Sequence, residues 1–153
     1  MKRLFYPVLI PAFLCCAIFI DAARVADARD SSPATSDDLD YAQVVLVRAF
    51  EQEKGVWRFE VTVRHNDEGW NHYADLWQVV EHESGSVIAE RVLAHPHETE
   101  QPFTRGLGDI DTPKGTSVVT VRARCNVHGY GGREVLVDLN VKKGNRFEVN
   151  RSY

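Results

Sequence analysis

Residues 56–64, VWRFEVTVR, decide the fold class. Apolar and polar side chains alternate without a break, with Trp57, Phe59, Val61 and Val63 on one face and Arg58, Glu60, Thr62 and Arg64 on the other. A period of two is the signal of a half-buried strand, because successive side chains of an extended chain point to opposite faces. The stretch therefore predicts a strand with one face in a hydrophobic core.

Similar short segments lie on both sides of this strand. We expect strands at residues 43–50, 72–81, 87–93, 102–107, 117–125 and 134–141. The side chains expected to point inward are Trp77, Val79, Val119, Val121, Ala123, Cys125, Val135, Val137, Leu139 and Val141. Residues 109–115, DIDTPKG, are expected to form a turn, and Phe147 and Val149 to add a small edge strand. About seven short strands without a helical pattern predict an all-β, antiparallel β-sandwich of the immunoglobulin or fibronectin III type.

The N-terminus has the pattern of a secretory signal peptide. Lys2 and Arg3 precede an apolar run at residues 5–20, and Ala26-Asp27-Ala28 has the form of a cleavage site. We expect a signal peptide at residues 1–28, a disordered linker at 29–40, and one β-sandwich domain at 41–153. The predicted location is periplasmic or secreted.

Two other interpretations of the N-terminus are weaker. A run of about 16 apolar residues is shorter than the roughly 20 that a membrane-spanning helix needs. Cys15 and Cys16 raise the question of a lipoprotein, but Phe13 and Leu14 stand where a lipid-attachment box has small residues. Contact with the membrane is therefore expected only through the signal segment.

Charge and cysteine content exclude some classes of protein. The chain has 18 basic and 22 acidic residues and a formal net charge of −4. A mildly acidic chain without a basic patch does not fit a nucleic-acid-binding protein. Cys125 is the only cysteine after the signal, so no intramolecular disulfide is expected and the fold must depend on its core.

Five of the 6 histidines fall in three short segments, at residues 65–72, 93–101 and 126–132. Alternate loops of an antiparallel strand series lie at the same end, so these three segments should meet. In His95-Pro96-His97 the proline favours extended chain, in which residues i and i+2 project to one side. The predicted metal ligands are His72, His95, His97 and His128, whereas His65 and His82 are expected on the surface.

Imidazole ligands suit one divalent transition metal ion, Zn²⁺, Cu²⁺ or Ni²⁺. We expect binding rather than catalysis. The alternative is a metal-free adhesion or ligand-binding module, whose loop end contacts a protein or a carbohydrate. Less favoured are a metal-dependent hydrolase and a blue-copper-like electron carrier using Cys125 and His128, for which no axial methionine follows in the sequence.

Three motifs, WxHY, HPHxxEQPF and HGxGG, occur in residues 69–79 (GWNHYADLWQV), 91–105 (RVLAHPHETEQPFTR) and 127–132 (VHGYGG). With them the chain resembles a group of small exported bacterial proteins that has no assigned activity. The resemblance covers roughly residues 60–140 and implies export, but no reaction. A fixed cysteine at the place of Cys125 is not a feature of that group, which weakens the blue-copper alternative.

Overall fold

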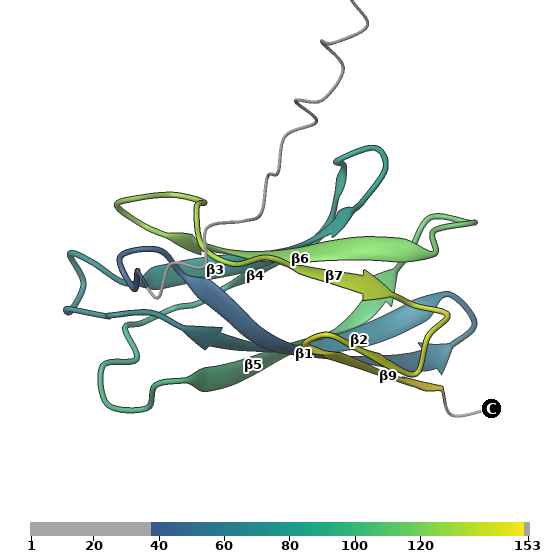
Figure 1. Ribbon diagram of the computed structural model, residues 1–153, viewed down its shortest axis with the longest axis horizontal. Helices are drawn as coiled ribbons and strands as arrows, with labels where there is room; N and C mark the ends of the chain where they lie inside the picture. Colours follow the sequence, from purple (N-terminus) through teal and green to yellow (C-terminus); the bar gives the residue numbers. More distant parts are fainter. Residues whose placement is uncertain (1–37, 152–153) are drawn as a thin grey trace, which may run out of the picture. The chain divides into compact units, whose positions relative to one another are not determined.

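The computed structural model describes residues 38–151, and this part of the chain is all-β (Figure 1). Its strands are β1 (Gln43–Glu53), β2 (Val56–Arg64), β3 (Ala74–Glu81), β4 (Val87–Val92), β5 (Phe103–Asp111), β6 (Val118–Cys125), β7 (Val135–Asp138), β8 (Lys143–Gly144) and β9 (Phe147–Arg151). Across residues 38–151, no helix has the length and apolar character needed to cross a membrane. The predicted signal peptide, and the predicted linker up to residue 37, lie outside the described residues.

The strands form two sheets packed face to face. One sheet has the order β5-β2-β1-β9-β8, and the other has the order β4-β3-β6-β7. Every pairing is antiparallel except that of β1 with β9, which is parallel. The predicted antiparallel β-sandwich is thus confirmed, and all seven predicted strands are present. The strand expected at Phe147 and Val149 is present as β9, but its predicted position at an edge is wrong, since β9 lies between β1 and β8.

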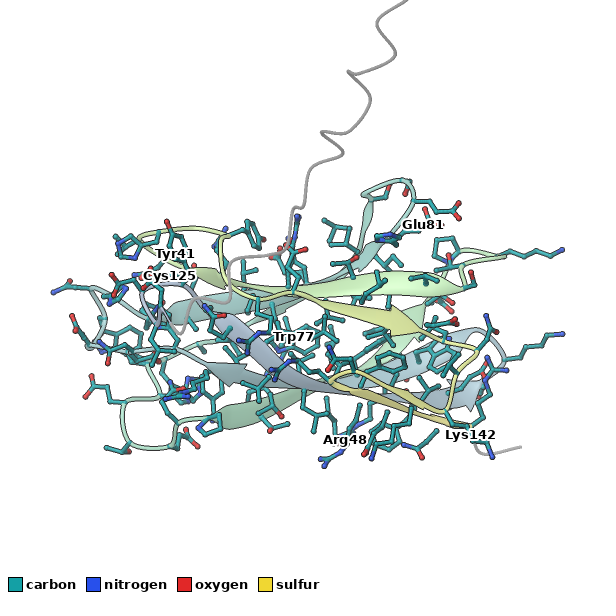
Figure 2. The ribbon with its side chains drawn as sticks, in the orientation of Figure 1. Tyr41, Arg48, Trp77, Glu81, Cys125 and Lys142 are labelled. Atoms are coloured by element: carbon teal, nitrogen blue, oxygen red, sulfur yellow. The ribbon has the colours of Figure 1, made fainter. Side chains whose placement is uncertain are left out.

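The core lies between the sheets, where the predicted alternation places it. Trp57, Phe59, Val61 and Val63 of β2 are buried, and so are the inward residues expected on β6. Figure 2 shows Trp77 of β3 between the two sheets; its side chain is fully buried. Each sheet contributes one apolar face, and burial of these faces is the main stabilising term of such a domain.

Two local expectations are wrong. The sequence pattern places Val141 inward, but this residue is 43% exposed, because β7 ends at Asp138 and a turn follows, with the Val141 amide donating to the Asp138 carbonyl. Residues 109–111, expected in a turn, continue β5. Ile110 is buried opposite Trp57, and this apolar contact extends the strand past two acidic neighbours.

The three histidine-containing loops meet at one end of the sandwich, at the left of Figure 1. The Tyr73 amide donates to Asn126 Oδ1 at 2.9 Å, which joins the β2–β3 loop to the β6–β7 loop. The His97 amide donates to Asp67 Oδ2 at 2.6 Å, which joins the β4–β5 loop to the β2–β3 loop. The predicted convergence of the loops is confirmed.

Candidate metal centre

Asp67, in the loop after β2, holds this end of the molecule together. Its carboxylate is fully buried, with Oδ1 accepting from His65 Nδ1 at 2.6 Å and from the Ala74 amide at 3.1 Å. Oδ2 accepts from the His97 amide. Burial alone would raise the pKa of Asp67, but the hydrogen bonds from these three donors outweigh it and leave the pKa below its ordinary value. The ionised carboxylate therefore fixes His65 and joins two loops to the start of β3.

His65 is buried, so its expected place on the surface is wrong. Because ionised Asp67 can only accept, Nδ1 of His65 donates to it. Nε2 faces the interior of the loop end, 3.2 Å from the Asp40 carbonyl oxygen. A carbonyl oxygen also only accepts, so Nε2 is open to a metal ion only when it gives up this contact. A carboxylate that accepts from one ring nitrogen and orients the other is the usual support of a histidine metal ligand.

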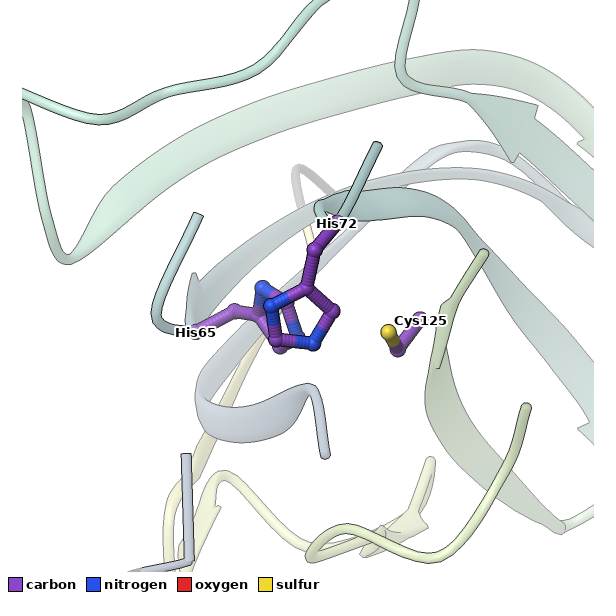
Figure 3. Close-up of side chains that lie close together, drawn as sticks. All are labelled: His65, His72 and Cys125. Atoms are coloured by element: carbon purple, nitrogen blue, oxygen red, sulfur yellow. The ribbon is translucent and has the colours of Figure 1, made fainter. Parts of the chain in front are cut away.

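His65, His72 and Cys125 come close together in the structure (Figure 3). One potential ligand atom from each lies within 4.8 Å of the others. Cys125 ends β6 and is buried, as its inward position in the sequence pattern predicts. The backbone amides of Val127 and His128 donate to its Sγ at 3.4 and 3.5 Å.

His128 lies beside this group. Its Nδ1 is 3.2 Å from His72 Nε2, 3.7 Å from Cys125 Sγ and 3.0 Å from the Asp40 carbonyl oxygen. His72 Nδ1 lies 3.7 Å from Glu68 Oε2, which leaves Nε2 toward the group. We call His65, His72, Cys125 and His128 the His–Cys cluster. Imidazole and thiolate together are donors that suit Zn²⁺ and copper.

Asp40 belongs to a segment that the sequence assigned to the linker. Its carbonyl oxygen lies between His65 Nε2 and His128 Nδ1, and the Leu39 carbonyl accepts from the Asn66 amide at 3.0 Å. Residues 38–40 therefore take part in the site. Their polar composition gave no sign of these contacts, which are made by backbone atoms.

The structure brings the four predicted ligands together as two pairs. His72 and His128 are in contact within the His–Cys cluster, and the rings of His95 and His97 are 4.4 Å apart. The metal-ligand group found within residues 38–151 is His65, His72 and Cys125, so His72 is the one predicted ligand that it includes. His128 contacts this group, whereas His95 and His97 are not part of it. His97 Nδ1 approaches Asp67 Oδ2 only to 3.9 Å.

The His97 side chain is buried and is not exposed as a metal ligand. It stacks on Phe103 with ring centroids 3.7 Å apart and an interplanar angle of 6°. Neither ring nitrogen has a hydrogen-bond partner among the described residues. Burial, followed by the charges of Arg105 and His95, lowers the pKa of His97, so the ring is neutral. His95 is exposed, and its Nδ1 lies 3.0 Å from the Pro96 carbonyl oxygen.

Aromatic side chains near the loops differ in exposure. Phe103 is buried against His97. Trp70 is 67% exposed and packs edge-on against Tyr73. His82 is exposed at a distance from the cluster in sequence and contacts Thr120, in agreement with its expected place on the surface.

Comparison with known proteins gives partial matches. No family model matches the chain. A protein of Halomicrobium mukohataei named "Putative lipoprotein" is 38% identical over 122 residues, which are 80% of this chain and 59% of the relative. Among solved structures, a superoxide reductase (neelaredoxin) of Archaeoglobus fulgidus in the reduced form has a TM-score of 0.41 and 16% identity over 63% of this chain and 86% of its own. The superoxide reductase (1Fe-SOR) of Giardia intestinalis has a TM-score of 0.40 and 11% identity over 63% of this chain and 99% of its own. The chain thus spans 59% of the length of the relative that it matches in sequence.

Proposed function

We propose that this protein is an exported metal-binding β-sandwich whose His–Cys cluster holds one divalent transition metal ion, Zn²⁺, Cu²⁺ or Ni²⁺. The observation that carries the proposal is the approach of His65, His72 and Cys125, whose ligand atoms lie within 4.8 Å of one another. The donor set keeps His72 and His128 from the sequence prediction. His65 and Cys125 take the places of His95 and His97.

The spacing of the donors supports this assignment. Ligands about 2.0–2.3 Å from a tetrahedral Zn²⁺ ion are roughly 3.3–3.7 Å apart. His72 Nε2 and His128 Nδ1 are 3.2 Å apart, and His128 Nδ1 and Cys125 Sγ are 3.7 Å apart. The ligand atoms of His65, His72 and Cys125 lie within 4.8 Å of one another, so these side chains would have to move closer together to bind an ion at such distances. The buried Asp67–His65 pair supplies one ligand whose orientation is fixed before the ion arrives.

Elemental analysis tests the proposal. The full exported chain is purified without a histidine tag, treated with a chelator, and loaded separately with Zn²⁺, Cu²⁺ and Ni²⁺. We expect about one ion per chain for at least one metal, and loss of that ion in His72→Ala and Cys125→Ser. His82→Ala is the matched control, because His82 is an exposed histidine outside the cluster. No retained metal, or equal loss in the control, contradicts the proposal.

A redox role is the second candidate, favoured by one observation. Cys125 and His128 are separated by two residues and share the site with His72, which gives a thiol and two imidazoles. A cysteine with two histidines is the donor set of trigonal copper sites that transfer electrons. The Cu²⁺-loaded protein would then have an intense thiolate-to-copper absorption in the visible range that Cys125→Ser abolishes. A copper-loaded protein without this band excludes the electron-carrier role but leaves metal storage or transport.

Export rests on two independent supports. The N-terminal sequence has the charge, apolar run and cleavage pattern of a secretory signal. The relative from Halomicrobium mukohataei is named a lipoprotein, which is a class of exported protein. Expression of the full chain followed by cell fractionation tests this: we expect the protein outside the cytoplasm, shortened by about 28 residues. Full-length protein in the cytoplasm would contradict export.

A further inference from the structure

A cavity of about 630 Å³ is lined in part by His65 and Asp67. Three arginines, Arg64, Arg133 and Arg146, line it. We propose that this cavity binds a small ligand with several anionic oxygens, either carboxylates or phosphates. Anion binding here does not require a metal ion in the His–Cys cluster, because the arginines belong to other segments of the chain.

The fold brings the three arginines together from segments far apart in sequence. Arg64 ends β2, which pairs with the first residues of β1. The Arg133 carbonyl accepts from the Val44 amide at 2.9 Å, and the Arg146 carbonyl accepts from the Val47 amide at 2.9 Å. The backbone of each arginine is thus tied to the start of β1. This arrangement places three positive side chains around one hollow without loss of backbone hydrogen bonds.

None of the three guanidinium groups has an ion pair or a hydrogen bond to another residue within 38–151. Arginines elsewhere on the domain do have partners: Arg48 with Glu148, Arg58 with Glu60, Arg105 with Glu100, Arg124 with Asp75, and Arg151 with Glu51. Arginines elsewhere on this acidic protein are therefore paired, whereas the three at the cavity are not paired within the described part of the chain. A concentration of unpaired positive charge in a hollow attracts anions.

The remaining lining adds little opposing charge. Asp67 and Glu98 are the acidic residues that line the cavity. Asp67 is committed to its three donors, so Glu98 is the single acidic side chain free to oppose an anion. Gln101 also lines the cavity, and its Nε2 is buried without a hydrogen-bond partner among the described residues. The cavity thus has an excess of donors over acceptors.

Arg146 has a backbone conformation that favours glycine. Its φ is +63°, in the left-handed region, where any Cβ adds strain. Such strain persists where the surrounding structure enforces it and is common at ligand sites. Glycine at this position would relieve the strain and keep the carbonyl that accepts from the Val47 amide. The strained residue adds the third guanidinium group to the lining of the cavity.

The ligand class follows from the donors and the size. The planar guanidinium fork matches a carboxylate or a phosphate with two parallel hydrogen bonds. Three such groups in a cavity of about 630 Å³ fit a compact molecule with two or three anionic groups, and pockets of this size hold small organic ligands. Citrate and pyrophosphate are suitable probes of the two chemistries.

Calorimetric titration of the metal-free full chain tests the proposal. The protein is first treated with a chelator, because citrate binds metal ions and this binding would itself produce heat. Failure of the proposed anion site is then distinguishable from failure of the proposed metal site. We expect saturable binding of citrate, pyrophosphate or both. Saturation by citrate alone identifies carboxylate as the ligand chemistry, and saturation by pyrophosphate alone identifies phosphate. No saturable binding of either probe overturns the proposal.

Variants locate the binding. We expect Arg64→Ala, Arg133→Ala and Arg146→Gly each to weaken affinity roughly tenfold, because each removes charge-assisted hydrogen bonds. Arg146→Gly should keep or raise the melting temperature, which separates lost binding from lost folding. Glu98→Gln should tighten binding by a few-fold, since it removes the opposing charge. Arg58→Ala is the control, because Arg58 lies on the same face of β2 as Arg64 and does not line the cavity. Equal weakening in the control, or weaker binding in Glu98→Gln, overturns the assignment.

Discussion

Replacement of Asp67 by asparagine is the sharpest test of how the loop end is built. Asparagine has nearly the same shape, so it creates no cavity, but it exchanges one acceptor oxygen for an NH₂ donor and removes the negative charge. In the folded protein the carboxylate accepts from His65 Nδ1, the Ala74 amide and the His97 amide. In either orientation, Asp67→Asn sets its amide NH₂ against at least one of these donors.

The expected loss of stability is about 3 kcal/mol. A hydrogen bond to a charged group contributes about 1.5–3 kcal/mol, and a neutral acceptor makes bonds that are roughly half as strong. Asp67→Asn loses one such bond outright and weakens the others. A domain of this size is stable by about 5–15 kcal/mol, so the variant should still fold.

Urea unfolding followed by tryptophan fluorescence measures the effect, because Trp77 is fully buried in the core. With a slope of about 1.5 kcal/mol per molar urea, a loss of 3 kcal/mol lowers the midpoint by about 2 M. Glu68→Gln is the control, since the neighbouring Glu68 side chain is 64% exposed and should shift stability by less than about 0.5 kcal/mol. A midpoint for Asp67→Asn within about 0.5 M of the wild type would refute the assignment of Asp67 as the residue that joins the loops.

Three further predictions concern the same end of the molecule. The lowered pKa of Asp67 means that its stabilisation is complete above the ordinary value of 3.8 and is lost as the pH falls through the lower folded-state value. The stability difference between the wild type and Asp67→Asn should therefore close in urea titrations at acid pH; a difference that persists there argues against an ionised carboxylate. His97→Phe should keep the bound metal and be as stable as the wild type or up to about 1 kcal/mol more stable, because His97 stacks on Phe103 with both ring nitrogens unpaired. Loss of one metal equivalent in this variant would place His97 among the ligands. Gly132→Ala should cost about 1–3 kcal/mol, since its Cβ would clash with the Ala42 carbonyl oxygen; a melting temperature unchanged within about 2 °C would show that the loop adapts.

The alternation of side chains predicted the sandwich because most of the core lies on regular strands. The bounds of β2 and the inward faces of β2 and β6 agree with the sequence pattern. His65 continues the inward series of Phe59, Val61 and Val63, and the same rule places it in the interior. The expectation that it lies on the surface overlooked that signal. The predicted ligand set consequently lacked the histidine whose orientation the structure fixes best.

Asp67 illustrates what a single sequence cannot reveal. It is fully buried, whereas the adjacent Glu68 is 64% exposed, and no local pattern distinguishes the two carboxylates. The difference arises from the Ala74 amide, 7 residues away, and the His97 amide, 30 residues away. The same holds for the Asp40 carbonyl, whose role depends on contacts with distant rings. Loop convergence could be inferred from strand order, but the atoms that meet there could not.

The parallel pairing of β1 with β9 has a consequence for the order of assembly. The first strand of the domain is bordered on one side by the last, and the ion pair between Arg48 and Glu148 joins residues 100 positions apart. Such long-range pairing closes late, because the entropy of ordering the intervening chain must be overcome first. The five-stranded sheet therefore cannot be completed until β9 is available. A polypeptide translocated from its N-terminus would keep this sheet open until β9 had crossed.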